Sequence, residues 1–272
     1  MEPLQVLFED PLLPSFSLPE TLATLYGGSF GFEEDRVVAN FVASIDGVTA
    51  IPGSERSSQL ISGGSEADRL VMGMLRASVD VVVVGAGTLR NHPGARWTAE
   101  QAAPSHGAAF AELRRRLGRR GSEPDLAVVT ASGKLDPAHP ALARAKILTT
   151  EKGAASLGER LHGGSIVVLG EDDGAIEPSA AIEVLRRVGD RSILVEGGPR
   201  LLGSFVAHGA VDELFLTVSP LLAGRSETDY RPGLVDGIEL LPDDPQRTRL
   251  LSVRGHDSYL FLRYGLVDRG SR

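Results

Sequence analysis

The stretch Ser192-Ile-Leu-Val-Glu-Gly-Gly-Pro-Arg-Leu-Leu-Gly203 contains, in order, an apolar run, an acid, two glycines and a proline. This order predicts a buried strand that ends near Glu196, a tight turn at Gly197 and Gly198, and a helix that begins at Pro199, since proline suits the first helical turn. Bare glycine backbone and the free N–H groups of a helix start both favour a bound phosphate. Because the spacing is not Gly-x-Gly-x-x-Gly, an ordinary strand-to-helix connection is the alternative.

Short β-branched runs alternate with segments of helical pattern along the chain. A Ser65/Asp68 capping box marks one helix start, and the turn Gly255-His-Asp-Ser258 predicts an antiparallel hairpin. This rhythm predicts an α/β fold with a mixed, mostly parallel sheet, helices on both faces and a C-terminal antiparallel hairpin. The expected strands are residues 37–44, 79–84, 126–130, 146–148, 165–169, 192–195, 214–218, 250–254 and 259–264, and the expected helices are residues 66–77, 106–118, 177–188 and 199–208.

The same rhythm predicts one main domain. Residues 1–35 are expected to form an N-terminal extension packed on the domain, residues 36–265 the domain itself, and residues 266–272 a C-terminal tail. The stretch 97–123, rich in alanine, arginine and glycine, is interpreted as an insertion, because the strand–helix alternation resumes after it.

The composition excludes several classes of protein. A net charge of −8 over 272 residues argues against sequence-independent nucleic-acid binding. The absence of cysteine excludes disulfides, thiolate metal sites and cysteine nucleophiles. No apolar run reaches the length of a membrane span, and the first ten residues lack the basic start of a signal peptide. A cytoplasmic protein is the expectation.

Three other predicted strand ends carry polar side chains. Asp46 follows the first strong strand, Thr88 follows a valine run and a glycine turn, and Ser132 with Lys134 follows the next strand. Ligands of open α/β sheets bind at the carboxyl ends of the strands, so these groups are candidates to contact a substrate or a dinucleotide. The structural alternatives are a turn aspartate, a helix-capping threonine and a solvated lysine.

Arginine side chains supply the candidate cations. Arg56, Arg76 and Arg96 can each make the forked contact that a phosphomonoester accepts, and solvated surface arginines are the alternative. Two further patterns are given a structural interpretation. The nucleophile-elbow match around Ser29 follows a predicted helix instead of a strand, and the six histidines lie far apart, so neither a hydrolase nor a metal site is expected.

Taken together, five ordered segments resemble the reductase domain of riboflavin biosynthesis, a dihydrofolate-reductase-like family, over residues 37–264. The resemblance implies a three-layer fold, a homodimer, and NADPH-dependent hydride transfer to 5-amino-6-(5-phosphoribosylamino)uracil. The zinc deaminase domain of bifunctional relatives needs cysteines that this chain lacks, so a stand-alone reductase is implied. The segments are Ala43-Ser-Ile-Asp-Gly47, Leu75-Arg-Ala77, Val84-Gly-Ala-Gly-Thr88, Val195-Glu-Gly-Gly-Pro199 and Val211-Asp-Glu-Leu214.

The resemblance also implies a role for each matching residue. Glu196 and Asp46 are the catalytic candidates, and the choice of proton donor between them stays open. The implied substrate-binding residues are Ser58, Arg76 and Arg96. The implied cofactor-binding residues are Ala43, Asp46, Gly85, Gly87, Thr88, Ser132, Gly197, Gly198, Pro199, Arg200, Leu201 and Leu202.

The chain departs from the family pattern on the substrate side. Asn40 stands near the position of a common lysine, Leu60 replaces an aromatic residue, and Arg90-Asn-His92 replaces an acidic stretch. The departures at Asn40 and Leu60 motivate one alternative hypothesis, the reduction of another heterocycle such as a dihydropterin or folate. A non-catalytic NADPH-binding protein is a second alternative. The partner in each case is a small molecule.

Overall fold

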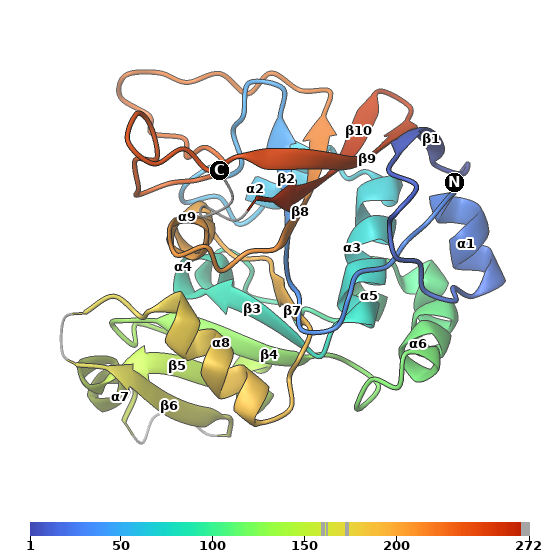
Figure 1. Ribbon diagram of the computed structural model, residues 1–272. Helices are drawn as coiled ribbons and strands as arrows, with labels where there is room; N and C mark the ends of the chain where they lie inside the picture. The colour runs from blue at the N-terminus through green and yellow to red at the C-terminus, as the bar shows by residue number, and fades with distance from the viewer. Residues whose placement is uncertain (159–160, 162, 172–173, 268–272) are drawn as a thin grey trace.

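One mixed sheet organises the molecule. The computed structural model describes residues 1–158, 161, 163–171 and 174–267, and its strands form a ten-stranded sheet in the order β1-β9-β10-β8-β2-β7-β3-β4-β5-β6 (Figure 1). Every strand predicted from the sequence is present, with ends that differ by at most two residues. The strands are β1 (Gln5–Glu9), β2 (Val37–Ser44), β3 (Val81–Gly85), β4 (Asp125–Thr130), β5 (Lys146–Thr150), β6 (Ser165–Gly170), β7 (Ile193–Val195), β8 (Glu213–Ser219), β9 (Thr248–His256) and β10 (Tyr259–Leu266).

Most of the sheet is parallel, as predicted. All neighbouring strands from β8 through β2, β7, β3, β4 and β5 to β6 run parallel. Strands β9 and β10 form the predicted antiparallel hairpin, and β1 adds to β9 in antiparallel orientation. Tyr259 pairs with His256, so Asp257 and Ser258 make the turn, and Asp257 takes the left-handed φ of 51° that such a turn needs.

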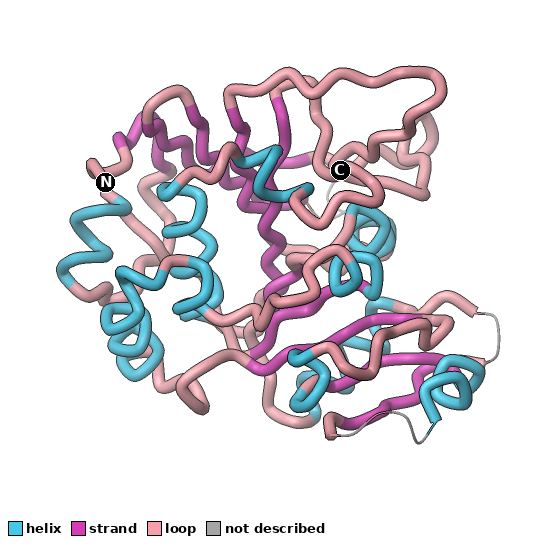
Figure 2. Tube along the Cα trace, turned by 180° about the vertical axis from the view of Figure 1, so that it is seen from behind, coloured by secondary structure: helices cyan, strands magenta, loops and turns pink. Residues whose placement is uncertain are grey.

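Helices cover both faces of this sheet. The described helices are α1 (Glu20–Tyr26), α2 (Ser57–Ser62), α3 (Glu66–Ser78), α4 (Ala86–Arg90), α5 (Ala99–Ala102), α6 (Gly107–Arg116), α7 (Glu151–Leu157), α8 (Pro178–Arg187) and α9 (Pro199–Ala207). Figures 1 and 2 show α3, α5 and α6 grouped beside α1, whereas α8 and α9 lie apart from that group. None of the helices in the described ranges is both long and apolar enough to cross a membrane.

The four valines of β3 pack against the helices on both faces of the sheet. The side chains of Val82 and Val84 pack in the core beneath α3, whereas Val81 and Val83 pack in a second core beneath α8 and α9. All four have no exposed surface. A strand buried on both faces is a continuous apolar run instead of an alternating one, which is why the sequence pattern identified it.

The N-terminal segment does more than pack on the domain. It supplies the edge strand β1, and the side chains of Leu22, Tyr26, Phe30 and Phe32 belong to the core that α3 covers. The division of the chain at residues 35 and 265 stays a prediction, and the predicted tail 266–272 lies outside the described residues from position 268 onward.

Candidate active site

Two of the predicted glycine turns meet at the carboxyl edge of the sheet. Strands β3 and β7 are parallel neighbours, with Val83 opposite Val195, so the turns that follow them lie side by side. A Cβ placed on Gly197 would lie only 2.6 Å from the Gly85 nitrogen, and one on Gly198 would lie 3.4 Å from the Thr88 Oγ1. Close backbone contact between the turns therefore requires glycine at position 197.

The same turns bring two helix starts together. Helix α9 begins at Pro199, as the sequence predicts, and the short helix α4, which was not predicted, begins directly after β3. Gly198 has a φ of 59°, a backbone conformation that glycine adopts without strain. The N–H groups at the start of a helix and glycines without a side chain both favour the binding of a phosphate group.

Glu196 lies at the end of β7, between these turns and α3. Its backbone N–H donates to the Val83 carbonyl at 3.0 Å. Its carboxylate accepts hydrogen bonds from Arg76 Nε at 3.1 Å and from Arg76 Nη2 at 2.6 Å. The side chains are only 5% and 9% exposed, so this forked ion pair is buried at the edge of the site.

The structure gives Arg76 a partner that the sequence did not reveal. The sequence assigned Arg76 to the substrate, but its Nε and Nη2 are bonded to Glu196 and its Nη1 donates to the Thr98 carbonyl at 3.1 Å. A guanidinium held in this way fixes the position of the Glu196 carboxylate. The contact of Arg76 with a substrate phosphate stays a prediction.

Asp46 anchors a loop beside the site. Its carboxylate accepts hydrogen bonds from Ser44 Oγ at 2.6 Å and from the Ala223 and Gly224 N–H groups at 3.0 and 2.8 Å. The Ser44 bond first, then the Ala223 bond, lower the pKa of Asp46. These bonds match the turn-aspartate alternative.

Ser132 lies at the same edge, one strand further along. It follows β4, the neighbour of β3, and its side chain is exposed. The loop is held at both ends: Thr150 Oγ1 donates to the Ala131 carbonyl at 2.7 Å, and Arg90 Nη1 donates to the Lys134 carbonyl at 3.1 Å. The cofactor contact of Ser132 stays a prediction, and its position next to the glycine turns is compatible with it.

The remaining residues predicted to bind the cofactor differ in the exposure of their side chains. Ala43 is buried in β2, and Leu202 is buried in the core, so their side chains do not face solvent. Leu201 lies against the turn, because a Cβ on Gly85 would lie 3.8 Å from the Leu201 Cβ. Arg200 is exposed and its Nε bonds Asp236 at 3.1 Å.

One substrate-side candidate, Ser58, contacts His92, a residue that the sequence offered only as a departure from the family pattern. Ser58 Oγ lies 3.0 Å from His92 Nε2, and His92 Nδ1 lies 2.8 Å from the Thr88 carbonyl oxygen. Arg96 is exposed, and its guanidinium makes no hydrogen bond or ion pair with any other residue that the structure describes. The spacing of four residues between Thr88 and His92 was the available signal for this contact, because it is the spacing of one helical turn.

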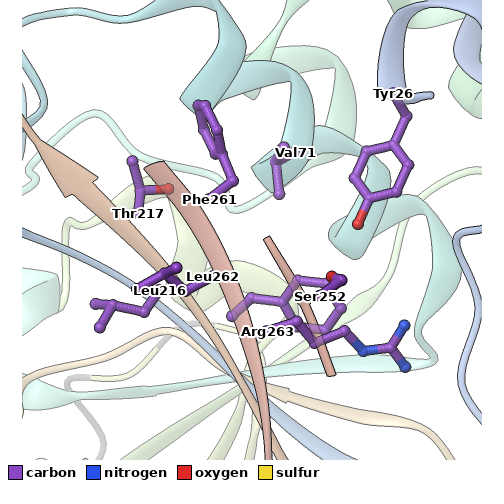
Figure 3. Close-up of a pocket in the computed structure, with 9 residues that line it drawn as sticks. Tyr26, Val71, Leu216, Thr217, Ser252, Phe261, Leu262 and Arg263 are labelled. Carbon is purple, nitrogen blue, oxygen red and sulfur yellow. The ribbon is translucent and has the colours of Figure 1, made fainter. Parts of the chain in front are cut away.

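Helix α3 also carries a buried carboxyl group, that of Asp68. Asp68 lies beneath Ser65, whose hydroxyl accepts the Asp68 N–H at 3.2 Å and caps α3 as predicted. Burial raises the pKa of Asp68 to about 6, although the Thr217 hydroxyl opposes this by hydrogen-bonding the carboxylate, and the charge of Glu196 adds to the increase. Thr217 also borders a narrow cavity lined by side chains of α1, α3, β8, β9 and β10 (Figure 3).

The raised pKa of Asp68 predicts a pH-dependent stability. Between about pH 4 and pH 6 the folded protein holds a proton that the unfolded chain has released, so the free energy of unfolding falls as the pH rises through this window. The loss at pH 7 is about 3 kcal/mol, from roughly two pKa units at 1.36 kcal/mol each. We expect Asp68→Asn to be more stable than the wild type at pH 7 by up to about this amount and equal to it near pH 4.

Urea unfolding at both pH values checks this expectation. Asp257→Asn is the matched control, because the Asp257 side chain is 81% exposed in the hairpin turn. Wild-type and Asp68→Asn stabilities that stay parallel across the pH range would contradict the prediction.

The sheet order, the C-terminal hairpin and the helices on both faces define an α/β protein built on one mixed, mostly parallel sheet. The sequence profile of the RibD C-terminal domain matches residues 35–254. The chain therefore belongs to the RibD C-terminal domain family.

Two related proteins support this membership. The chain is 31% identical over 216 residues to the 2,5-diamino-6-ribosylamino-4(3H)-pyrimidinone 5′-phosphate reductase of Archaeoglobus fulgidus, covering 75% of this chain and 88% of that protein. It is 32% identical over 193 residues to the riboflavin biosynthesis protein RibD of Mycobacterium tuberculosis, covering 71% of this chain and 44% of that protein.

Solved structures share the fold. A pyrimidine reductase-like protein from Corynebacterium diphtheriae superposes with a TM-score of 0.66 at 23% identity, covering 92% of this chain and 96% of that one. The riboflavin biosynthesis reductase Rib7 of Saccharomyces cerevisiae superposes with a TM-score of 0.57 at 14% identity, covering 92% and 95%. These similarities confirm the predicted fold.

Proposed function

We propose that this chain is an NADPH-dependent reductase that transfers a hydride to the ribosylamino group of a phosphorylated pyrimidine in riboflavin biosynthesis. The observation that carries the proposal is the contact between two bare glycine turns beside the buried Glu196–Arg76 pair. The family and the reductase activity named for the Archaeoglobus relative support it. A cytoplasmic homodimer is proposed from the family resemblance.

The chain offers a cradle that fits a dinucleotide. Gly85, Gly87 and Gly198 carry no side chain over the backbone at the starts of α4 and α9, Gly197 lets the two turns touch, and Ser132 lies on the neighbouring strand end. Bound NADPH would supply the hydride. The contribution of the protein is to hold donor and acceptor carbons close together and to exclude water, because hydride transfer needs positioning more than covalent help.

We assign the proton step to Glu196. Reduction of a ribosylamine carbon requires a proton at the neighbouring oxygen or nitrogen, and a positioned carboxyl group can hold or deliver it. Arg76 fixes the carboxylate of Glu196 from the side of α3. We prefer Glu196 to Asp46 for this step because Glu196 lies at the end of β7 between the two glycine turns, whereas the oxygens of Asp46 accept from Ala223 and Gly224, so we propose that Asp46 shapes the site by anchoring the loop at residues 223–224.

The substrate phosphate is assigned to Arg96. Its exposed guanidinium is free to make a forked contact, whereas that of Arg76 is bonded to Glu196. We expect Arg96→Ala to raise the KM for a phosphorylated substrate at least tenfold, about 1.4 kcal/mol, and to leave the NADPH affinity within twofold. Arg187→Ala is the matched control, because Arg187 is exposed on α8 and pairs with Glu183 on the same helix.

Loss of NADPH absorbance, measured with purified protein, tests the proposed activity. The substrates to compare are the 2,5-diaminopyrimidinone ribosyl phosphate, the corresponding aminouracil ribosyl phosphate and dihydrofolate. We expect turnover with a ribosylaminopyrimidine and none with dihydrofolate. Turnover of dihydrofolate alone would replace the proposed substrate class, and no NADPH binding by calorimetry would overturn the enzymatic proposal.

A further inference from the structure

We propose that His92 is a positioning residue that makes the Ser58 hydroxyl a hydrogen-bond acceptor toward the substrate and ties it to the cofactor turn at Thr88. The inference rests on the proposed function for its kinetic consequences, but its geometric core concerns residues of this chain alone. It assigns Ser58 Oγ, while the His92 ring is neutral, the role of acceptor for an N–H or O–H group of the substrate.

The first step is the tautomer of the His92 ring. The Thr88 carbonyl oxygen, 2.8 Å from Nδ1, can only accept a hydrogen bond, so Nδ1 must carry a proton. In the neutral ring the other nitrogen, Nε2, is then an acceptor. Ser58 Oγ lies 3.0 Å from Nε2 and donates its single proton there.

The second step is the effect on Ser58. A hydroxyl has one proton and two lone pairs, and the proton of Ser58 is committed to His92. The side chain of Ser58 is exposed on α2, so its lone pairs remain available at the surface. A substrate group bound there must therefore be a donor, such as an amino group of the pyrimidine or a hydroxyl of the sugar.

The third step is the rigidity of the arrangement. The His92 carbonyl accepts a hydrogen bond from His139 Nε2 at 3.0 Å, and Ala141 N–H donates to His139 Nδ1 at 3.2 Å, which sets the tautomer of His139 as well. The Trp97 ring is only 4% exposed and packs edge-on against His92, with centroids 6.4 Å apart. Backbone and ring of His92 are thus both held in place.

The fourth step is the coupling between the two sides of the site. Ser58 belongs to α2, which packs against β2, whereas Thr88 belongs to α4 and lies against the Gly198 turn. His92 is the side chain that connects them. Movement of the cofactor turn therefore moves the hydroxyl that meets the substrate.

Nitrogen-15 NMR of the histidine rings in the full-length protein tests the geometry without any need for activity. We expect His92 to be the Nδ1–H tautomer at neutral pH, and we expect Ser58→Ala to change the Nε2 chemical shift of His92. A proton found on Nε2 would overturn the inference even in an active enzyme.

Steady-state kinetics test the consequence for the substrate. Ser58→Ala and His92→Phe should each raise the KM for the ribosylaminopyrimidine about tenfold, with kcat within threefold of wild type, and the double variant should be no worse than the more impaired single variant. His208→Phe is the control, because His208 lies at the far end of α9. Multiplied losses in the double variant, or unchanged KM values, would contradict the coupling.

The two arms separate the possible failures. A wild-type protein that turns over no pyrimidine would defeat the proposed function, while the NMR result would still decide the His92 geometry. If His92→Phe does not fold, the tautomer of the wild-type ring and the Ser58→Ala variant still decide the inference.

Discussion

Glu196→Gln should lower kcat at least 100-fold while the Kd for NADPH stays within about threefold, since general acid–base groups contribute factors of 10² to 10⁴. The amide cannot hold or deliver the proton that the reduced ribosylamine requires. The substitution also leaves the Arg76 guanidinium buried without its countercharge, because the two side chains are only 5% and 9% exposed. Breaking a buried pair in this way costs about 3–5 kcal/mol of stability. Single-turnover kinetics, calorimetry and urea unfolding measure the three effects.

A double variant separates catalysis from stability. Arg76→Met combined with Glu196→Gln removes both charges, so we expect it to recover much of the stability that the single variant loses. It should not recover turnover, since the carboxyl group is still absent. If Glu196→Gln keeps more than half of the wild-type kcat, Glu196 is a structural residue and the proton step belongs elsewhere.

Gly197→Ala should be strongly destabilising, although it adds a single methyl group to the site. Its Cβ would lie 2.6 Å from the Gly85 nitrogen and from the Val84 Cα, and both of these are backbone atoms that cannot rotate away. The turns after β3 and β7 would have to separate. We expect a loss of about 3 kcal/mol in the free energy of unfolding, at the upper end of overpacking costs, and at least a tenfold loss of NADPH affinity.

Gly94→Ala provides the matched control for this substitution. A Cβ on Gly94 would meet nothing within 4 Å, and Gly94 does not have a left-handed φ. Its stability should stay within about 0.5 kcal/mol of wild type. An unfolding curve for Gly197→Ala that overlays the control would show that the turns do not require their close contact.

The local sequence pattern predicted the strands that are buried on both faces and the helices that begin with a capping residue or a proline. The strand 37–44 was predicted with the bounds that the structure has, and Ser65 caps α3 as expected. The hairpin at the C-terminus and the helix that starts at Pro199 were also predicted. These features depend on neighbours within a few residues, so periodicity and capping chemistry suffice to identify them.

The short elements were missed for a physical reason. Helices α2, α4, α5 and α7 have four to seven residues, too few to show an amphipathic period, and helices of this length are stabilised by the surfaces on which they pack. Strand β1 lacked a buried pattern, because it is mostly exposed at the edge of the sheet and is held by β9.

By itself, the sequence determined the two glycine turns and the acid beside them, because these depend on short runs of adjacent residues. The alternation of short patterns indicated the α/β class, and five ordered segments between residues 43 and 214 indicated the family. Only the tertiary structure decided which groups meet. Arg76 reaches Glu196 across 120 positions, Asp46 binds the loop at residues 223–224, and Ser58 Oγ lies 3.0 Å from His92 Nε2. Such contacts follow from the spatial order of the strands, which places β7 between β2 and β3, and no local periodicity encodes that order.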